Sequence, residues 1–130
     1  MKTLIAEDDF TSRLLLEEVL GRLGPVHVAL NGREAVDAFG FALAASDPYD
    51  LICLDIMMPE MDGREALRRI RGLEEAAGIT STHGARIVMI TAIDHEQSVT
   101  DAFHGLCDAY LCKPVGKGKL LKLLSQYHLV

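Results

Sequence analysis

The sequence predicts an α/β protein, a doubly wound parallel sheet of five strands in which each strand is followed by a helix. Short, wholly apolar runs alternate along the chain with longer amphipathic stretches. Strands that are apolar on both faces are typical of a sheet covered by helices on both sides, and strands separated by helices pair in parallel through right-handed crossovers. A length of 130 residues fits one domain, residues 1–130, with no output domain expected inside it.

Each predicted strand is an apolar run bounded by polar or turn-forming residues. The first run stops at three consecutive acids, the second begins after Gly24-Pro25, and the other three each stop at a polar residue. These boundaries place the strands at residues 3–6, 26–30, 51–54, 87–90 and 109–112.

Each predicted helix repeats apolar residues at a spacing of three or four positions. Asn31 can cap the second helix, and Ser46-Asp47-Pro48 breaks it. The third helix is predicted to end at Arg71, before a polar connection over 72–85 that is long for its place. The predicted helices are residues 10–23, 32–45, 63–71, 94–104 and a last one around 120–124.

Composition excludes several classes of protein. Lys and Arg number 13 against 19 Asp and Glu, a net charge of −6 that disfavours nucleic acid as a direct partner. No apolar run approaches the roughly 20 residues of a membrane span, and the amino terminus does not resemble a signal peptide. We therefore expect a cytoplasmic protein that does not bind membranes. Cys53, Cys107 and Cys112 show no paired spacing and are expected to be small buried side chains.

Polar side chains follow four of the five predicted strands. Asp8 and Asp9 follow the first strand, Asp55 the third, Thr91 the fourth and Lys113 the fifth. An open parallel sheet binds its ligands at the carboxyl ends of the strands, so we expect these five residues to converge at one edge. Each of them alone also has an ordinary explanation, as a helix cap or as a solvated side chain.

Such a set of residues predicts a phosphoryl-transfer site. Carboxylates about 4 Å apart repel one another by about 4 kcal/mol per pair at an effective dielectric constant near 20. Mg²⁺ would relieve this repulsion, because it binds carboxylates, waters and phosphate oxygens. Lys113 and Thr91 could then contact a phosphoryl group. Asp55, on a strand near the middle of the sheet, is the best-placed covalent acceptor.

The motifs around these residues resemble the receiver domain of two-component response regulators, of the chemotaxis-regulator type. The resemblance covers residues 1–127, in family order, and rests on Asp8-Asp9, the run D-I-M-M-P-E-M-D-G over 55–63, Thr91-Ala92 and Lys113-Pro114. It implies a flavodoxin-like fold with strand order 2-1-3-4-5. It also implies phosphorelay signalling by a domain that catalyses only its own phosphorylation and dephosphorylation.

The resemblance implies a role for each acidic residue. Asp55 would accept the phosphoryl group. Asp9 would bind Mg²⁺ directly and Asp8 largely through water. The backbone carbonyl of Met57 would complete the metal shell.

The resemblance also implies a switch. Thr91 and Lys113 would contact the phosphoryl oxygens, and the Lys113-Pro114 peptide would be cis. Movement of Thr91 would let Tyr110 rotate inward, which would bias the face made by the fourth helix, fifth strand and fifth helix. The alternative for Tyr110 is a half-buried strand aromatic with its hydroxyl in water.

The implied donor is a histidine kinase or a histidine phosphotransfer protein, and the chain would be a monomer or a weak dimer when phosphorylated. One alternative is a docking module that works without phosphorylation. A Mg²⁺-dependent phosphatase would need a second Asp two residues after the nucleophile, where Met57 stands. A flavin carrier would need a phosphate-cradling loop after the first strand, where Glu7, Asp8 and Asp9 would repel phosphate.

Overall fold

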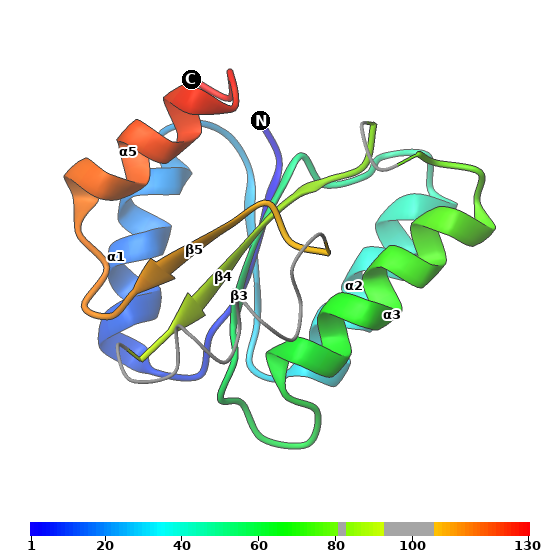
Figure 1. The fold of residues 1–130 in the computed structure, drawn as a ribbon, viewed down its shortest axis with the longest axis horizontal. Coiled ribbons are helices and arrows are strands. Elements are labelled where there is room, and N and C mark those ends of the chain that lie inside the picture. Colours follow the sequence, from blue (N-terminus) through cyan, green and yellow to red (C-terminus); the bar gives the residue numbers. More distant parts are fainter. Residues whose placement is uncertain (81–82, 93–105) are drawn as a thin grey trace.

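A five-stranded parallel sheet forms the centre of the protein in the computed structural model, which describes residues 1–80, 83–92 and 106–130 (Figure 1). The strand order is β2-β1-β3-β4-β5, which confirms the predicted fold class and topology. The strands are β1 (Thr3–Ala6), β2 (Val26–Ala29), β3 (Leu51–Asp55), β4 (Arg86–Thr91) and β5 (Ala109–Cys112).

Helices cover both faces of this sheet. Figure 1 shows α1 and α5 on one face and α2 and α3 on the other. The predicted helix over 94–104 lies outside the described residues. In the described part of the chain, no helix is both long and apolar enough to span a membrane. The helices are α1 (Phe10–Gly21), α2 (Gly32–Ala44), α3 (Gly63–Ala76) and α5 (Lys117–Gln126).

Neighbouring strand residues alternate between two core layers. Leu4 and Ile52 lie in the layer that includes side chains of α2 and α3, whereas Ile5 and Cys53 lie in the layer that includes those of α1 and α5. All four side chains are fully buried. The central strands β1 and β3 are largely apolar because both of their faces are covered, as the sequence predicted, whereas β2, at one edge of the sheet, exposes His27 and Val28.

The cysteines are not all buried as expected. Cys53 is fully enclosed, and this burial raises the pKa of its thiol to about 12. Cys107 and Cys112 are only half-buried. They lie just before and at the end of β5, which is the edge strand of the sheet.

Helix α3 is longer than predicted. It runs to Ala76 rather than ending at Arg71, so the long connection expected over 72–85 begins only after Ala76. The reason is a buried polar side chain on its inner face. Glu74 is 5% exposed, its carboxylate lies 2.7 Å from the Arg71 guanidinium, and it accepts a hydrogen bond from the Ala85 amide. The apolar spacing of Leu67, Ile70 and Leu73 continues past Arg71, but it does not indicate the last turn, on which Glu74 is buried by its ion pair.

Candidate functional site

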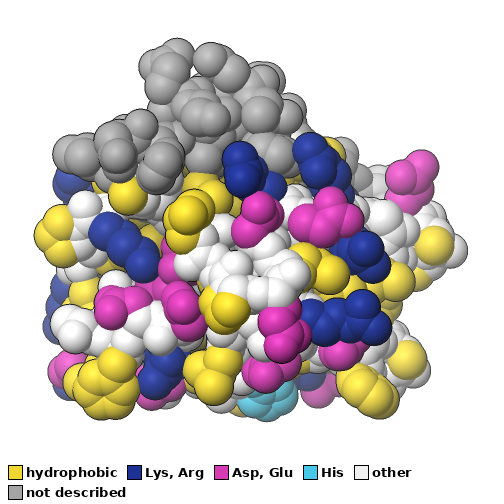
Figure 2. All heavy atoms as spheres, turned by 90° about the horizontal axis from the view of Figure 1, so that it is seen from below, with side chains coloured by type: hydrophobic (Ala, Val, Ile, Leu, Met, Phe, Trp, Pro, Cys, Tyr) yellow, Lys and Arg dark blue, Asp and Glu magenta, His cyan; other side chains and the backbone are white. Residues whose placement is uncertain are grey.

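The carboxyl ends of three strands bring the site residues together. Asp55 is the last residue of β3, and Thr91 is the last residue of β4. Lys113 directly follows β5. Its amide donates a hydrogen bond to the Thr91 carbonyl, which holds the two residues side by side at the carboxyl ends of their strands. Figure 2 views this edge of the sheet, where acidic side chains lie beside basic and hydrophobic ones.

An acidic cluster occupies this edge. Glu7, Asp8 and Asp55 each place one carboxylate oxygen within 4.8 Å of the others. The register of β1 with β3 explains this cluster. Ala6 pairs with Leu54, so the residues that follow them, Glu7 and Asp55, lie next to each other. The Glu7 amide also donates to the Ala29 carbonyl, which continues the β1–β2 ladder by one residue.

The structure separates the two residues of the predicted acidic pair, because Asp8 lies in the cluster and Asp9 lies outside it. Asp9 does not join the cluster: it is the N-cap of α1, and its carboxylate accepts a hydrogen bond from the Ser12 amide. Hydrogen bonding to Ser12 holds the pKa of Asp9 below its ordinary value of 3.8. Asp9 is exposed, whereas Glu7 is fully buried. The position of β1, which ends at Ala6, is the signal that identifies Glu7 as the first residue beyond the strand.

Glu7 is a buried acid without a directional hydrogen bond. Among the described residues, neither of its carboxylate oxygens has a hydrogen-bond partner of good geometry. The Lys113 ammonium forms an ion pair with Oε1 at 2.8 Å. Burial, followed by the nearby Asp55 carboxyl group, raises the pKa of Glu7 from 4.5 to about 7, although Lys113 opposes this shift.

Lys113 bridges the two buried acids. Its Nζ lies 2.8 Å from Glu7 and 3.2 Å from Asp55 Oδ2. Burial alone would lower the pKa of Lys113, but the two carboxylates outweigh it and raise the pKa above its ordinary value of 10.5. The Lys113-Pro114 peptide is cis, as expected.

Of three further predicted residues, Thr91 and Tyr110 have contacts outside the acidic cluster, and Met57 contacts Asp55. Thr91 is buried, and its hydroxyl donates to the Ala92 carbonyl at 3.0 Å. Tyr110 is half-buried and packs against the core layer that includes side chains of α2 and α3. The Met57 amide donates to Asp55 Oδ1 at 3.3 Å, while its side chain is exposed. The metal role of the Met57 carbonyl stays a prediction.

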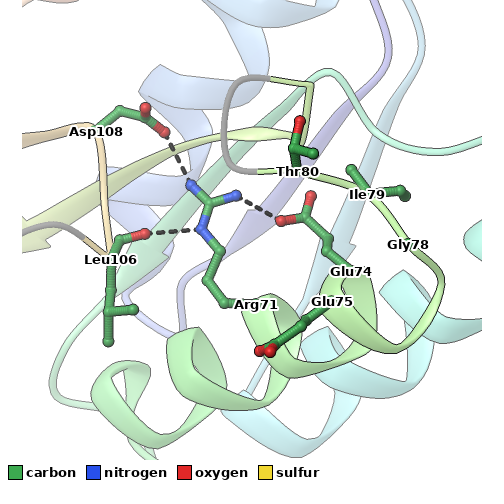
Figure 3. A pocket seen from close by; sticks show the side chains of 8 residues that line it. All are labelled: Arg71, Glu74, Glu75, Gly78, Ile79, Thr80, Leu106 and Asp108. Carbon is green, nitrogen blue, oxygen red and sulfur yellow. Dashed lines mark hydrogen bonds and ion pairs between the residues drawn. The ribbon is translucent and has the colours of Figure 1, made fainter.

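A cavity of about 650 Å³ lies away from this cluster, beside the carboxyl-terminal half of α3 (Figure 3). The Arg71 guanidinium enters it but is already engaged by Glu74, Asp108 and the Leu106 carbonyl, at 2.7, 3.0 and 2.7 Å. The Ala85 carbonyl is a fourth acceptor, at 2.9 Å, and a guanidinium engaged by four acceptors has little capacity left for a ligand. The strand-end cluster is therefore the better candidate for the functional site.

Comparison with known proteins identifies the family. The family model described as the response regulator receiver domain matches residues 3–125. The chain belongs to this family. It is a receiver domain of two-component phosphorelay systems, which are signalling systems.

Relatives carry this receiver domain alone or as part of a longer protein. The two-component response regulator ORR41 of Oryza sativa subsp. japonica is 34% identical over 133 residues, which cover 99% of this chain and 95% of that protein. Probable histidine kinase 2 of Oryza sativa subsp. indica is 32% identical over 132 residues. That match covers 94% of this chain but only 12% of the kinase.

Solved structures share the fold. The receiver domain of sensor histidine kinase PA1611 from Pseudomonas aeruginosa PAO1, with a magnesium ion coordinated in its active site cleft, matches with a TM-score of 0.75 and 26% identity, covering 97% of this chain and 95% of that one. The co-crystal structure of Saccharomyces cerevisiae Ypd1, a histidine phosphotransfer protein, with the Ssk1 receiver domain matches with a TM-score of 0.80 and 28% identity. That match covers 98% of this chain and 88% of the other.

Proposed function

We propose that Asp55 accepts a phosphoryl group from a phosphohistidine of a histidine kinase or histidine phosphotransfer protein. The observation that carries this proposal is the position of Asp55, 3.2 Å from the Lys113 ammonium and inside the cluster with Glu7 and Asp8. A carboxylate oxygen attacks phosphorus, the bond from phosphorus to the imidazole nitrogen breaks, and the imidazole leaves with that electron pair. Donor and receiver would meet in the cytoplasm.

The acidic cluster fits a hard divalent cation such as Mg²⁺. Glu7 supplies buried carboxylate oxygens that lack directional hydrogen bonds among the described residues, and Asp8 supplies an exposed carboxylate. We propose Glu7, Asp8 and Asp55 as side-chain ligands, with the Met57 backbone carbonyl as a further ligand. Asp9, which caps α1, is not among the proposed ligands. A bound Mg²⁺ would neutralise negative charge on the phosphoryl oxygens.

Lys113 and Thr91 would hold the phosphoryl group. The ammonium already lies beside Asp55 and can pair with a phosphoryl oxygen. The Thr91 hydroxyl donates to a neighbouring carbonyl and would have to turn to reach the phosphoryl group. Tyr110 would follow this movement and alter the face of β5 and α5, to which an output partner would bind.

The domain would act as a phosphoacceptor and not as an enzyme with turnover on other substrates. It would catalyse its own phosphorylation and dephosphorylation. It would be a monomer, or a weak dimer once phosphorylated.

Intact mass spectrometry after incubation with a small-molecule phosphodonor tests this function. The wild-type protein should gain one phosphoryl group only when Mg²⁺ is present, and Asp55→Asn should gain none. An Asp62→Asn variant is the matched control, because Asp62 is the N-cap of α3 and Asn caps helices equally well. No gain in the wild-type protein with any donor would contradict the proposal and favour a phosphorylation-independent docking module.

A further inference from the structure

Arg13, in the first turns of α1, contacts the backbone on both sides of Asp8. Its guanidinium donates to the Glu7 carbonyl at 3.3 Å, and its backbone amide donates to the Asp9 carbonyl at 2.9 Å. The Arg13 side chain is only 20% exposed. Among the described residues, no hydrogen bond or ion pair holds the Asp8 carboxylate itself. The position of Asp8 therefore depends on the backbone to either side of it.

The carbonyl that Arg13 contacts belongs to the peptide group between Glu7 and Asp8. A peptide group is planar, so a hydrogen bond that fixes this carbonyl also fixes the direction in which the chain enters Asp8. The Glu7 amide is held separately, because it donates to the Ala29 carbonyl at 3.1 Å. Arg13 therefore fixes the part of the loop that the β1–β2 ladder does not hold.

The Arg13 guanidinium is itself held in place on α1. Its Nε lies 3.9 Å from Glu17 Oε1, and its central carbon lies 5.6 Å from the centre of the Phe10 ring. A positive charge beside a cation site repels the cation. An arginine at this position therefore favours cation binding only if it orders the ligands more than its charge opposes the cation.

We propose that Arg13 is a positioning residue for the acidic cluster: its guanidinium holds the peptide group between Glu7 and Asp8, which keeps their carboxylate oxygens within 4.8 Å of each other. This inference rests on the proposed function, in which these carboxylates bind a divalent cation. Arg13 acts through the backbone of the loop and not as a ligand, since its contact with Glu7 is to the carbonyl.

Calorimetric titration with Mg²⁺ distinguishes positioning from charge by the sign of the effect. Arg13→Met removes the donors and the charge, and it should weaken Mg²⁺ binding about tenfold, as the loss of an outer-shell partner does. Charge alone predicts tighter binding in the same variant. Arg22→Met, which removes a 70% exposed arginine at the carboxyl end of α1, is the matched control and should stay within about twofold. Unchanged or tighter binding in Arg13→Met would overturn the proposal.

Two further variants separate the contact with Glu7 from the stability of α1. Arg13→Lys keeps the charge and can donate to a carbonyl, so its Mg²⁺ affinity should lie between those of Arg13→Met and the wild type. Glu17→Gln removes the ion pair on α1 but keeps the guanidinium, and its affinity should stay within about twofold of the wild type. A loss in Glu17→Gln as large as that in Arg13→Met would assign the effect to the ion pair, and the proposal would be wrong.

Backbone ¹⁵N relaxation of the metal-free protein gives a second readout. The amide of Asp8 should be rigid in the wild type, with an order parameter near 0.85. In Arg13→Met it should fall toward about 0.6 or acquire microsecond–millisecond exchange, whereas Glu17→Gln should leave it unchanged. An Asp8 amide that shows neither change in Arg13→Met would mean that the loop is fixed without the guanidinium, which would overturn the proposal.

The same samples separate this inference from the proposed function. Phosphorylation of the wild type, with unchanged or tighter Mg²⁺ binding in Arg13→Met, would reject the role of Arg13 and leave Asp55 as the acceptor. Weaker Mg²⁺ binding and a more mobile Asp8 amide in Arg13→Met, without any gain of phosphoryl mass in the wild type, would reject the acceptor role and support the positioning by Arg13.

Discussion

The carboxyl group of Glu7 is fully buried and lies in the proposed cation site, so its burial affects its charge. It has no exposed surface, and its pKa rises from 4.5 to about 7, chiefly because of that burial. An acid whose pKa is higher in the folded than in the unfolded protein binds its proton more tightly when folded. Glu7 therefore stabilises the metal-free protein most at low pH, and this contribution is lost as the pH rises.

The free energy of unfolding of the metal-free protein should fall between about pH 4.5 and pH 7, the window set by the two pKa values of Glu7. Urea denaturation in the presence of EDTA, repeated across this range, measures the fall. In Glu7→Gln, which cannot titrate, the fall should be smaller. An identical pH dependence in both proteins would contradict the assignment of the raised pKa to Glu7.

Asp8 and Asp9 are neighbours with different environments, so the same substitution should affect them differently. Asp8 lies in the acidic cluster, whereas Asp9 caps α1. Asp8→Asn should weaken Mg²⁺ binding about tenfold or more, since it removes a charged oxygen ligand. Asp9→Asn should leave Mg²⁺ affinity within about twofold, because Asn also caps helices. Calorimetric titration of both variants decides the point, and the reverse order of effects would restore Asp9 as the metal ligand.

Helix α3 contains two glycines that differ in the space around them. Gly63 begins the helix, and a Cβ on it would overlap the backbone carbonyl of Asp55. Gly72 lies inside the helix, and a Cβ on it would meet nothing within 4 Å. The first glycine allows the helix to approach the acceptor strand closely, while the second only weakens the helix.

Gly63→Ala should therefore destabilise the protein by about 1–3 kcal/mol, the usual cost of overpacking. Gly72→Ala should stabilise it by about 0.5–1 kcal/mol, the difference in helix propensity. Urea denaturation measures both free energies of unfolding. Equal destabilisation by the two substitutions would show that space at Gly63 is not the deciding factor.

The carboxyl-terminal half of α3 depends on the Arg71–Glu74 pair. Both side chains are largely buried, at 16% and 5% exposure, and Arg71 also bonds Asp108 and the Ala85 carbonyl. Arg71→Met should cost about 3–5 kcal/mol of unfolding free energy, because it leaves the buried Glu74 carboxylate without its cation. Arg69→Met on the same helix, where the arginine is 51% exposed, should stay within about 0.5 kcal/mol. Comparable losses in the two variants would show that burial of the pair is unimportant.

Sequence patterns could predict the elements whose signal is local. The apolar strands and the Asn31 cap of α2 lie as expected, and the alternation of strands and helices predicts a parallel sheet. The end of α3 was not predictable in this way, because Glu74 is a charged residue on an inward face. Its burial depends on contacts with Arg71 and Ala85 that a local pattern does not include.

The strand pairing of the sheet determines which acidic side chains lie together. Asp55 was predictable as the central carboxylate because its motif and its strand end agree. The first strand was predicted to end at Ala6, as it does, but the choice between Glu7 and Asp9 also depends on the register of β1 with β3, which a run of three acids does not reveal. The register places Glu7 beside Asp55. Asp9 directly precedes α1 and serves as its N-cap.

The central claim, that Asp55 is the phosphoryl acceptor, is tested most directly by locating the acyl phosphate in the chain. The wild-type protein is treated with a small-molecule phosphodonor and Mg²⁺, and borohydride then reduces the aspartyl phosphate to homoserine, which peptide mass spectrometry can place. We predict homoserine at position 55 and at no other aspartate. Homoserine at another position, or none in a protein that has gained phosphoryl mass, would contradict the account.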